Sequence, residues 1–132
     1  MTDQPKQPGH ILLVEDDRDI LESMTELLDL EGFRTDTAGN GQDALSRLEN
    51  FAELPDLILL DLMMPIMDGV EFRLRQKAHP RLSSIPVIIL SADGRAGNRL
   101  SREDSAPILR KPVDIQNLLD VIRQTMTSRS PK

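Results

Sequence analysis

The chain of 132 residues fits one domain, because compact domains usually run to about 100–150 residues. It is 39% hydrophobic, enough for a core, and its net charge of −6 argues against direct nucleic-acid binding. It holds no cysteine, which excludes disulfide scaffolds, thiolate zinc sites and cysteine nucleophiles. Without an apolar run near the roughly 20 residues that span a bilayer, we expect a cytoplasmic protein without membrane insertion.

Expected strands and helices alternate along the chain. Residues 1–9 are polar and include two prolines, so they predict a disordered lead rather than a signal peptide. The apolar runs that predict strands are Ile11–Val14, Phe33–Thr37, Leu57–Leu60, Pro86–Leu90 and Pro107–Leu109. The helical segments that follow them cover residues 18–31, 41–52, 70–78, 91–103 and 114–126, before a tail at 128–132.

The strand pattern predicts the fold class. The runs at 11–14, 57–60 and 86–90 are continuously apolar, as is typical of strands buried on both faces of a parallel sheet. The runs at 33–37 and 107–109 are mixed or short, which indicates edge strands. The alternation therefore predicts one α/β domain, a doubly wound five-stranded parallel sheet with helices on both faces.

Two helical segments carry specific expectations. In the segment 70–78, Val70 and Leu74 share the face that we expect to be buried. The segment 91–103 contains Gly94 and Gly97 and almost no apolar stripe. Each glycine inside a helix costs about 1 kcal/mol relative to alanine, so this helix should be short or frayed.

Acidic residues follow the first and third expected strands. Ligands of doubly wound sheets bind beyond the carboxyl ends of the strands, where Glu15, Asp16 and Asp61 would converge if these strands are neighbours. Ionised carboxylates repel one another there unless a cation joins them or one becomes protonated, and a hard divalent ion such as Mg²⁺ suits oxygen ligands. Asp17 directly precedes a helical segment and is expected to cap it instead.

Four motifs follow one another along the chain. They are Ile-Leu-Leu-Val-Glu-Asp-Asp at 11–17, Leu-Ile-Leu-Leu-Asp-Leu-Met-Met-Pro-Ile-Met-Asp-Gly at 57–69, Val-Ile-Ile-Leu-Ser-Ala at 87–92 and Lys-Pro at 111–112. In this order they resemble the response-regulator receiver domain, the phosphoacceptor half of bacterial two-component signalling, and the resemblance covers about residues 10–127. Any one of them is weak, but four in order at matching intervals are specific.

The resemblance implies a strand order of 2-1-3-4-5 in a flavodoxin-like three-layer sandwich with five helices, and a role for each matching residue. Asp61 would accept a phosphoryl group from the phosphohistidine of a histidine kinase or phosphotransfer protein. Glu15, Asp16 and the backbone carbonyl of Met63 would hold Mg²⁺ with Asp61. Lys111 would pair with the phosphoryl oxygens, and Ser91 would donate a hydrogen bond to one of them. The peptide bond between Lys111 and Pro112 is a candidate cis bond by the same resemblance.

Simpler interpretations stand beside these roles. Ser91 could merely end a strand, and Lys111 could be a solvated surface lysine. Asp68 is expected to start a helix rather than to act in chemistry. His10 and His79 are interpreted as exposed, and neither as the phosphodonor.

The chain departs from the family's pattern near the fifth strand. The aromatic residue that the family carries three positions before its lysine is Ile108 here, which has no ring to swing between buried and exposed positions. We therefore hypothesise that residues 92–104 become ordered when Ser91 engages a phosphoryl group.

Three functions remain open at this stage. The first is a stand-alone phosphoacceptor switch with no output domain and no turnover of an external substrate, whose effector protein is unknown. The second is an interaction module that keeps the fold without phosphorylation. The third is an aspartate-nucleophile phosphatase, disfavoured because Met63 stands where such enzymes usually carry a second aspartate.

Overall fold

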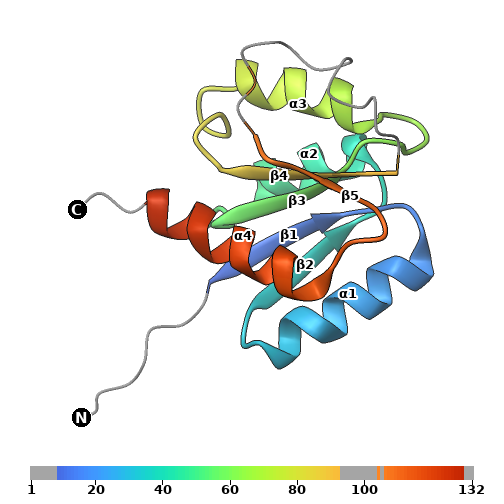
Figure 1. Cartoon of the computed structure of the whole chain (residues 1–132). Coiled ribbons are helices and arrows are strands. Elements are labelled where there is room, and N and C mark those ends of the chain that lie inside the picture. The colour runs from blue at the N-terminus through green and yellow to red at the C-terminus, as the bar shows by residue number, and fades with distance from the viewer. Residues whose placement is uncertain (1–8, 93–103, 105, 130–132) are drawn as a thin grey trace.

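The computed structural model of the chain describes residues 9–92, 104 and 106–129, apart from the side chains of residues 128 and 129 (Figure 1). Most of the expected lead, most of the expected helix at 91–103 and most of the tail lie outside these residues. The hypothesis of an ordering segment at 92–104 likewise falls almost wholly outside them.

Five parallel strands form the single sheet of the described residues. They are β1 (His10–Val14), β2 (Arg34–Ala38), β3 (Leu57–Asp61), β4 (Val87–Ser91) and β5 (Ile108–Arg110). Their order is β2-β1-β3-β4-β5, as the resemblance implied, with β2 and β5 at the edges. The doubly wound α/β fold is therefore confirmed.

Helices cover both faces of the sheet, so that the molecule has three layers. The described helices are α1 (Arg18–Leu30), α2 (Gly41–Asn50), α3 (Gly69–Ala78) and α4 (Ile115–Arg129). Figure 1 shows α1 and α4 on one face and α2 and α3 on the other. In the part of the chain that is described, no helix has the length and apolar character needed to cross a membrane.

The alternation of side chains along the strands divides the core into two clusters. On β1, Ile11 and Leu13 pack with residues of α1 and α4, whereas Leu12 and Val14 pack with residues of α2 and α3. All four side chains are completely buried. Continuous apolar runs are thus required because each interior strand has a hydrophobic layer on both sides.

Helix α3 buries a different face from the predicted one. Leu74 is 58% exposed and Val70 is only partly buried, whereas Phe72 and Gln76 are completely buried. The amide of Gln76 donates hydrogen bonds of 3.0 Å to the backbone carbonyls of Leu82 and of Ile85. A buried polar side chain is stable there because its donors are satisfied, which apolar periodicity does not indicate.

The helix starts agree with the capping residues in the sequence. Asp17 accepts hydrogen bonds from the backbone of α1, and Asp68 does so from that of α3. Asp114 accepts from the backbone N–H of Asn117 at 2.9 Å, at the start of α4. After α1 the chain turns at Gly32, whose φ of 94° lies in the left-handed region that glycine tolerates.

Candidate functional site

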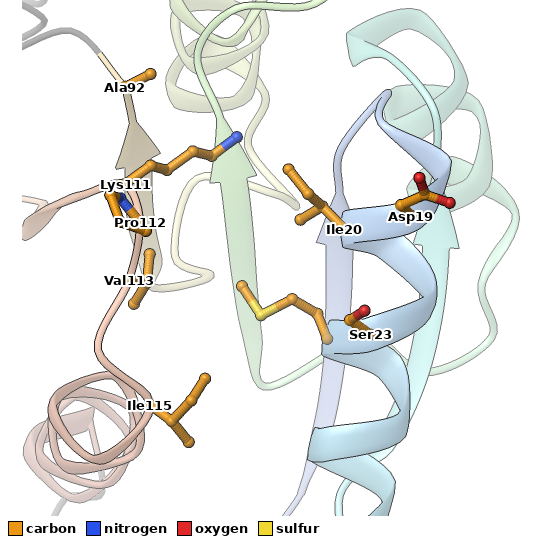
Figure 2. Close-up of a pocket in the computed structure, with 9 residues that line it drawn as sticks. Asp19, Ile20, Ser23, Ala92, Lys111, Pro112, Val113 and Ile115 are labelled. Carbon is orange, nitrogen blue, oxygen red and sulfur yellow. The ribbon is translucent and has the colours of Figure 1, made fainter.

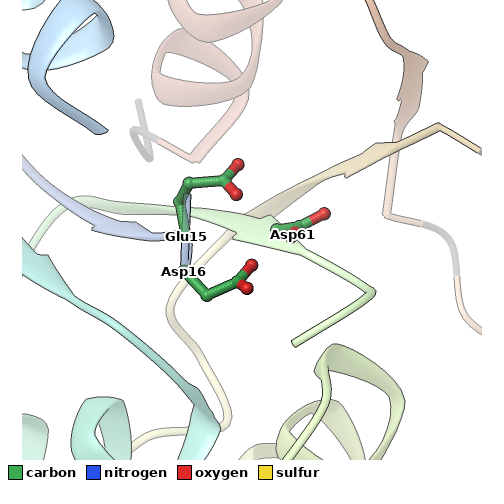
Figure 3. Close-up of side chains that lie close together, drawn as sticks. All are labelled: Glu15, Asp16 and Asp61. Carbon is green, nitrogen blue, oxygen red and sulfur yellow. The ribbon is translucent and has the colours of Figure 1, made fainter. Parts of the chain in front are cut away.

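Three carboxylates meet at the carboxyl ends of β1 and β3. Glu15 and Asp16 follow β1 directly, Asp61 is the last residue of β3, and one oxygen of each lies within 4.8 Å of the others (Figure 3). Glu15 and Asp61 are buried, whereas Asp16 is exposed. The register that pairs Val14 with Leu60 places the two strand ends side by side and so explains the convergence.

Lys111, which follows the edge strand β5, extends to this cluster. The Nζ of Lys111 lies 2.9 Å from Oε1 of Glu15 and 3.2 Å from Oδ1 of Asp61. Its backbone N–H donates to the carbonyl of Ser91 at 2.8 Å, and the following bond to Pro112 is cis, as expected. With only 19% of its side chain exposed, Lys111 is not a solvated surface lysine.

Burial and charge act against each other in this cluster. Burial raises the pKa of Glu15 and of Asp61, and the nearby ammonium of Lys111 offsets part of each rise. Burial alone would lower the pKa of Lys111, but its hydrogen bond to Glu15 and the charge of Asp61 outweigh it and raise that pKa. The negative charge of the buried carboxylates Glu15 and Asp61 is therefore stabilised by a neighbouring cation.

The loop after Asp61 is held tightly against the strand. The backbone N–H of Met63 donates a hydrogen bond to the Asp61 carboxylate. A Cβ on Gly69 would lie 2.5 Å from the backbone oxygen of Asp61, so only glycine fits this close approach. Between them, Ile66 has a φ of 69°, and the N–H of Met67 donates to the carbonyl of Pro65 at 2.7 Å. This is a γ-turn in the left-handed region, a strained conformation for a β-branched residue.

Ser91 lies at the same end of the sheet as the carboxylates, where the strands have their carboxyl ends. It is the last residue of β4 and is buried, one position beyond Leu90, the register partner of Asp61. Ile108 lies farther back on β5 and is 43% exposed. The structure thus gathers Glu15, Asp16, Asp61, Ser91 and Lys111 at one end of adjacent strands.

A cavity of about 540 Å³ opens beside Lys111, between α1 and the segment that joins β5 to α4 (Figure 2). Its walls are mostly apolar, and they include Ile20, Met24, Val113 and Ile115. Helix α1 forms one wall of the cavity, and Asp19 is the acidic residue of α1 that lines it. The site therefore has an apolar recess at its side.

The sequence-based interpretation of His10 was wrong. Its ring lies 2.7 Å from Oδ2 of Asp36, and only 12% of its side chain is exposed. It packs against the ring of Phe51 at the amino-terminal end of the sheet, far along β1 from Glu15. Asp36 lies on β2 two positions beyond Arg34, the register partner of His10, so only the pairing of β1 with β2 brings the two side chains together.

The sequence analysis also missed a buried ion pair between Arg73 and Asp104. The two side chains meet through two hydrogen bonds of 2.8 Å and are 12% and 2% exposed. Nothing in the spacing of these residues indicates the contact, because α3 and the segment before β5 are distant in sequence. Only the sheet order brings them together.

Comparisons with known proteins agree with this arrangement. The sequence profile of the response regulator receiver domain matches residues 11–123. The CpxR homolog of Haemophilus influenzae, a transcriptional regulatory protein, is 37% identical over 127 residues, which are 92% of this chain and 52% of that protein. The chain thus spans about half the length of such curated relatives.

Solved structures of similar chains show the same fold. The signal receiver domain of a histidine kinase from Syntrophus aciditrophicus superposes with a TM-score of 0.83 at 32% identity, and 94% of each chain is covered. The response regulator protein TrrA of Thermotoga maritima, solved with Mg²⁺ and BeF, has a TM-score of 0.78 at 28% identity over 88% of this chain and 97% of that one. With its strand order, its acidic cluster and its profile match, the chain belongs to the response regulator receiver domains of two-component signalling.

Proposed function

We propose that the chain is a phosphoacceptor switch in which Asp61 receives a phosphoryl group from a phosphohistidine. The observation that carries the proposal is the contact of buried Asp61 with both an acidic cluster and the Lys111 ammonium. Phosphoryl transfer needs positioning and charge neutralisation more than covalent assistance, and this site supplies both. We assign the domain to residues 10–127 and place it in the cytoplasm as part of the proposal.

The acidic cluster fits a bound Mg²⁺ ion. Glu15, Asp16 and Asp61 supply the hard oxygen ligands that this ion prefers, and the backbone carbonyl of Met63 would add a fourth. When bound, the ion supplies positive charge that offsets the negative charge of the carboxylates and of the incoming phosphoryl oxygens. The burial of Glu15 and Asp61 supports this role, because a buried carboxylate gains most from a neighbouring cation.

In the proposed transfer, a carboxylate oxygen of Asp61 attacks phosphorus as the bond from phosphorus to the donor histidine nitrogen breaks. The electron pair of that bond returns to the histidine nitrogen, and Asp61 becomes an acyl phosphate. Lys111 would then leave Asp61 for a phosphoryl oxygen, since its ammonium is already within 3.2 Å of the attacking carboxylate. The Ser91 hydroxyl would donate a hydrogen bond to another phosphoryl oxygen from the end of β4.

The partner in this proposal is a histidine kinase or a histidine phosphotransfer protein. The apolar cavity beside Lys111 supports it, because a donor protein must cover Asp61 closely enough to bring phosphorus to the carboxylate. A basic residue on that partner would complement Asp19, which lines this cavity. The effector that responds to phosphorylation is a further partner of unknown identity.

Intact mass spectrometry tests the proposal. The wild type and Asp61→Asn are incubated with acetyl phosphate and Mg²⁺, with Asp68→Asn as a matched control because asparagine also caps helices well. We expect one Mg²⁺-dependent phosphoryl adduct on the wild type and on Asp68→Asn, and none on Asp61→Asn.

The other outcomes identify the alternatives. A wild type without any adduct would contradict the proposal and favour an interaction module that works without phosphorylation. Steady hydrolysis of an external phosphoester would instead indicate a phosphatase. Absence of that turnover, together with the adduct, would agree with a switch that is not an enzyme in the usual sense.

A further inference from the structure

The ion pair between Arg73 and Asp104 has the geometry of a strong, specific contact. Nε and Nη2 of Arg73 each lie 2.8 Å from a different oxygen of the Asp104 carboxylate, so the guanidinium fork binds both oxygens at once. The hydrogen bonds from Arg73 lower the pKa of Asp104. With Asp104 only 2% exposed, this is not a screened surface pair of small consequence.

The pair belongs to a partly buried polar network that joins three segments of the chain. Nη1 of Arg73 donates to the side-chain oxygen of Gln76 at 2.7 Å, and Gln76 in turn binds the carbonyls that follow α3. On the other side, Asp104 accepts a hydrogen bond of 3.1 Å from the backbone N–H of Ala106. The network therefore fixes the chain just before β5 to the rigid frame of α3 and the entry to β4.

Strand β5 is held by its pairing with β4 and by the packing of Leu109 against the core. It is three residues long, lies at the sheet edge and contacts only β4 in the sheet. Its flanks are bound to β4 by the hydrogen bond from the Ile89 N–H to the Pro107 carbonyl and by the bond from Lys111 to Ser91. Lys111 follows β5 directly, so the placement of this short strand determines where the Lys111 ammonium lies.

We propose that Arg73 and Asp104 are positioning residues for the phosphoacceptor site, acting through β5 on Lys111. The proposal rests on the phosphoacceptor function proposed above. The ion pair fixes the start of the strand, the hydrogen bond to Ser91 fixes its end, and the Lys111 ammonium is thereby held ready for phosphoryl oxygens. Preorganisation of this kind lowers the cost of ordering a charged group when the anion arrives.

The test measures binding of Mg²⁺ and beryllofluoride, a phosphoryl mimic, by calorimetry under conditions in which every variant is fully folded. The variants are Asp104→Asn, Arg73→Met, their combination and Arg73→Lys, which keeps the charge but loses the planar fork. Arg75→Met is the matched control: Arg75 lies on the same helix and pairs with Glu71 at 2.8 Å on the exposed surface. Hydrogen exchange of the Lys111 amide is measured in parallel without ligand.

We expect each single variant to weaken beryllofluoride binding about fivefold, equivalent to about 1 kcal/mol, and the double variant to be no weaker than either. Arg73→Lys should lose less than Arg73→Met, and Arg75→Met should bind like the wild type. Exchange of the Lys111 amide should be faster in the variants of the pair and unchanged in the control. A purely structural ion pair would lower stability without changing the affinity of the folded protein.

Three results would overturn the positioning role while leaving the phosphoacceptor function intact. The first is that the single variants bind beryllofluoride with wild-type affinity. The second is that Arg75→Met loses as much affinity as the variants of the pair. The third is that the loss of affinity in the double variant equals the product of the losses in the two single variants. If Asp104→Asn does not fold, the comparison of Arg73→Lys with Arg73→Met decides the question. If the wild type itself shows no Asp61-dependent binding, the proposed function is wrong and the positioning role falls with it.

Discussion

Replacing Lys111 by methionine removes the counter-charge of two buried carboxylates while keeping the length of the side chain. Lys111 lies 2.9 Å from Glu15 and 3.2 Å from Asp61. At an effective dielectric constant of about 20, opposite unit charges about 3 Å apart attract by roughly 5 kcal/mol. The desolvation of the ammonium offsets part of this, and the loss of one partner of a buried pair usually costs about 3–5 kcal/mol.

We therefore expect Lys111→Met to unfold with a free energy about 3 kcal/mol lower than that of the wild type, which lowers Tm by on the order of 10 °C for a domain of this size. Thermal unfolding followed by circular dichroism at neutral pH, without divalent ions, measures the difference. Excess Mg²⁺ should restore part of the loss, because a cation again compensates Glu15 and Asp61. Mildly acidic pH should also reduce the difference in Tm between Lys111→Met and the wild type. The pKa values of Glu15 and Asp61 are raised, so these carboxylates are neutralised at a higher pH than ordinary ones and no longer need the lysine charge.

The matched control is Lys77→Met, which removes the same charge from an exposed position on α3. We expect its Tm to stay near that of the wild type, because exposed charges contribute little to stability. The electrostatic reasoning would be refuted if Lys111→Met were as stable as the wild type without Mg²⁺. It would also fail if Lys77→Met lost as much stability as Lys111→Met.

Three further predictions follow from particular contacts. Ile66 is 83% exposed with a φ of 69°, so Ile66→Asn should raise the free energy of unfolding by about 1 kcal/mol in urea titrations; a loss would show that the strain is absent. Gly69→Ala would place a Cβ 2.5 Å from the Asp61 backbone oxygen and should cost more than about 2 kcal/mol, whereas a neutral result would mean that the loop shifts freely. The pKa of Asp104 in the folded protein lies below the ordinary aspartate pKa of 3.8. The ion pair with Arg73 therefore contributes its full stability at pH values above 3.8, and this contribution is lost as the pH falls through the lowered pKa of Asp104. Asp104→Asn should thus be less stable than the wild type at neutral pH, with a gap that closes below pH 3.8, and a constant gap would contradict this.

The sequence was sufficient to predict the features that depend on strands and on their ends. Three continuous apolar runs indicate buried parallel strands, and the acids and the lysine that follow the runs come together wherever such strands are neighbours. The resemblance implied the strand order and the roles of the site residues; the order is confirmed, whereas the roles of Glu15, Asp16, Asp61, Met63, Ser91 and Lys111 stay predictions.

Features that depend on tertiary contacts were not predictable in the same way. Apolar periodicity placed Leu74 on the buried face of α3, but that face holds Gln76, whose amide is satisfied by backbone carbonyls from another segment. The Arg73–Asp104 pair and the His10–Asp36 pair likewise join residues that only the folded sheet brings together. No sequence pattern indicates the left-handed φ of Ile66, because an isoleucine is unfavourable in that conformation.

The two edges of the sheet limit how this domain can associate with other chains. Strand β5 is only three residues long and follows Pro107, which has no N–H to donate, and its last residue is the exposed Arg110. At the opposite edge, β2 carries the charged residues Arg34 and Asp36. A strand added from outside would gain few backbone hydrogen bonds at β5 and would meet charged side chains at β2. Both described edge strands therefore disfavour the addition of a strand from another chain, and partners are expected to bind helices, loops and side chains instead.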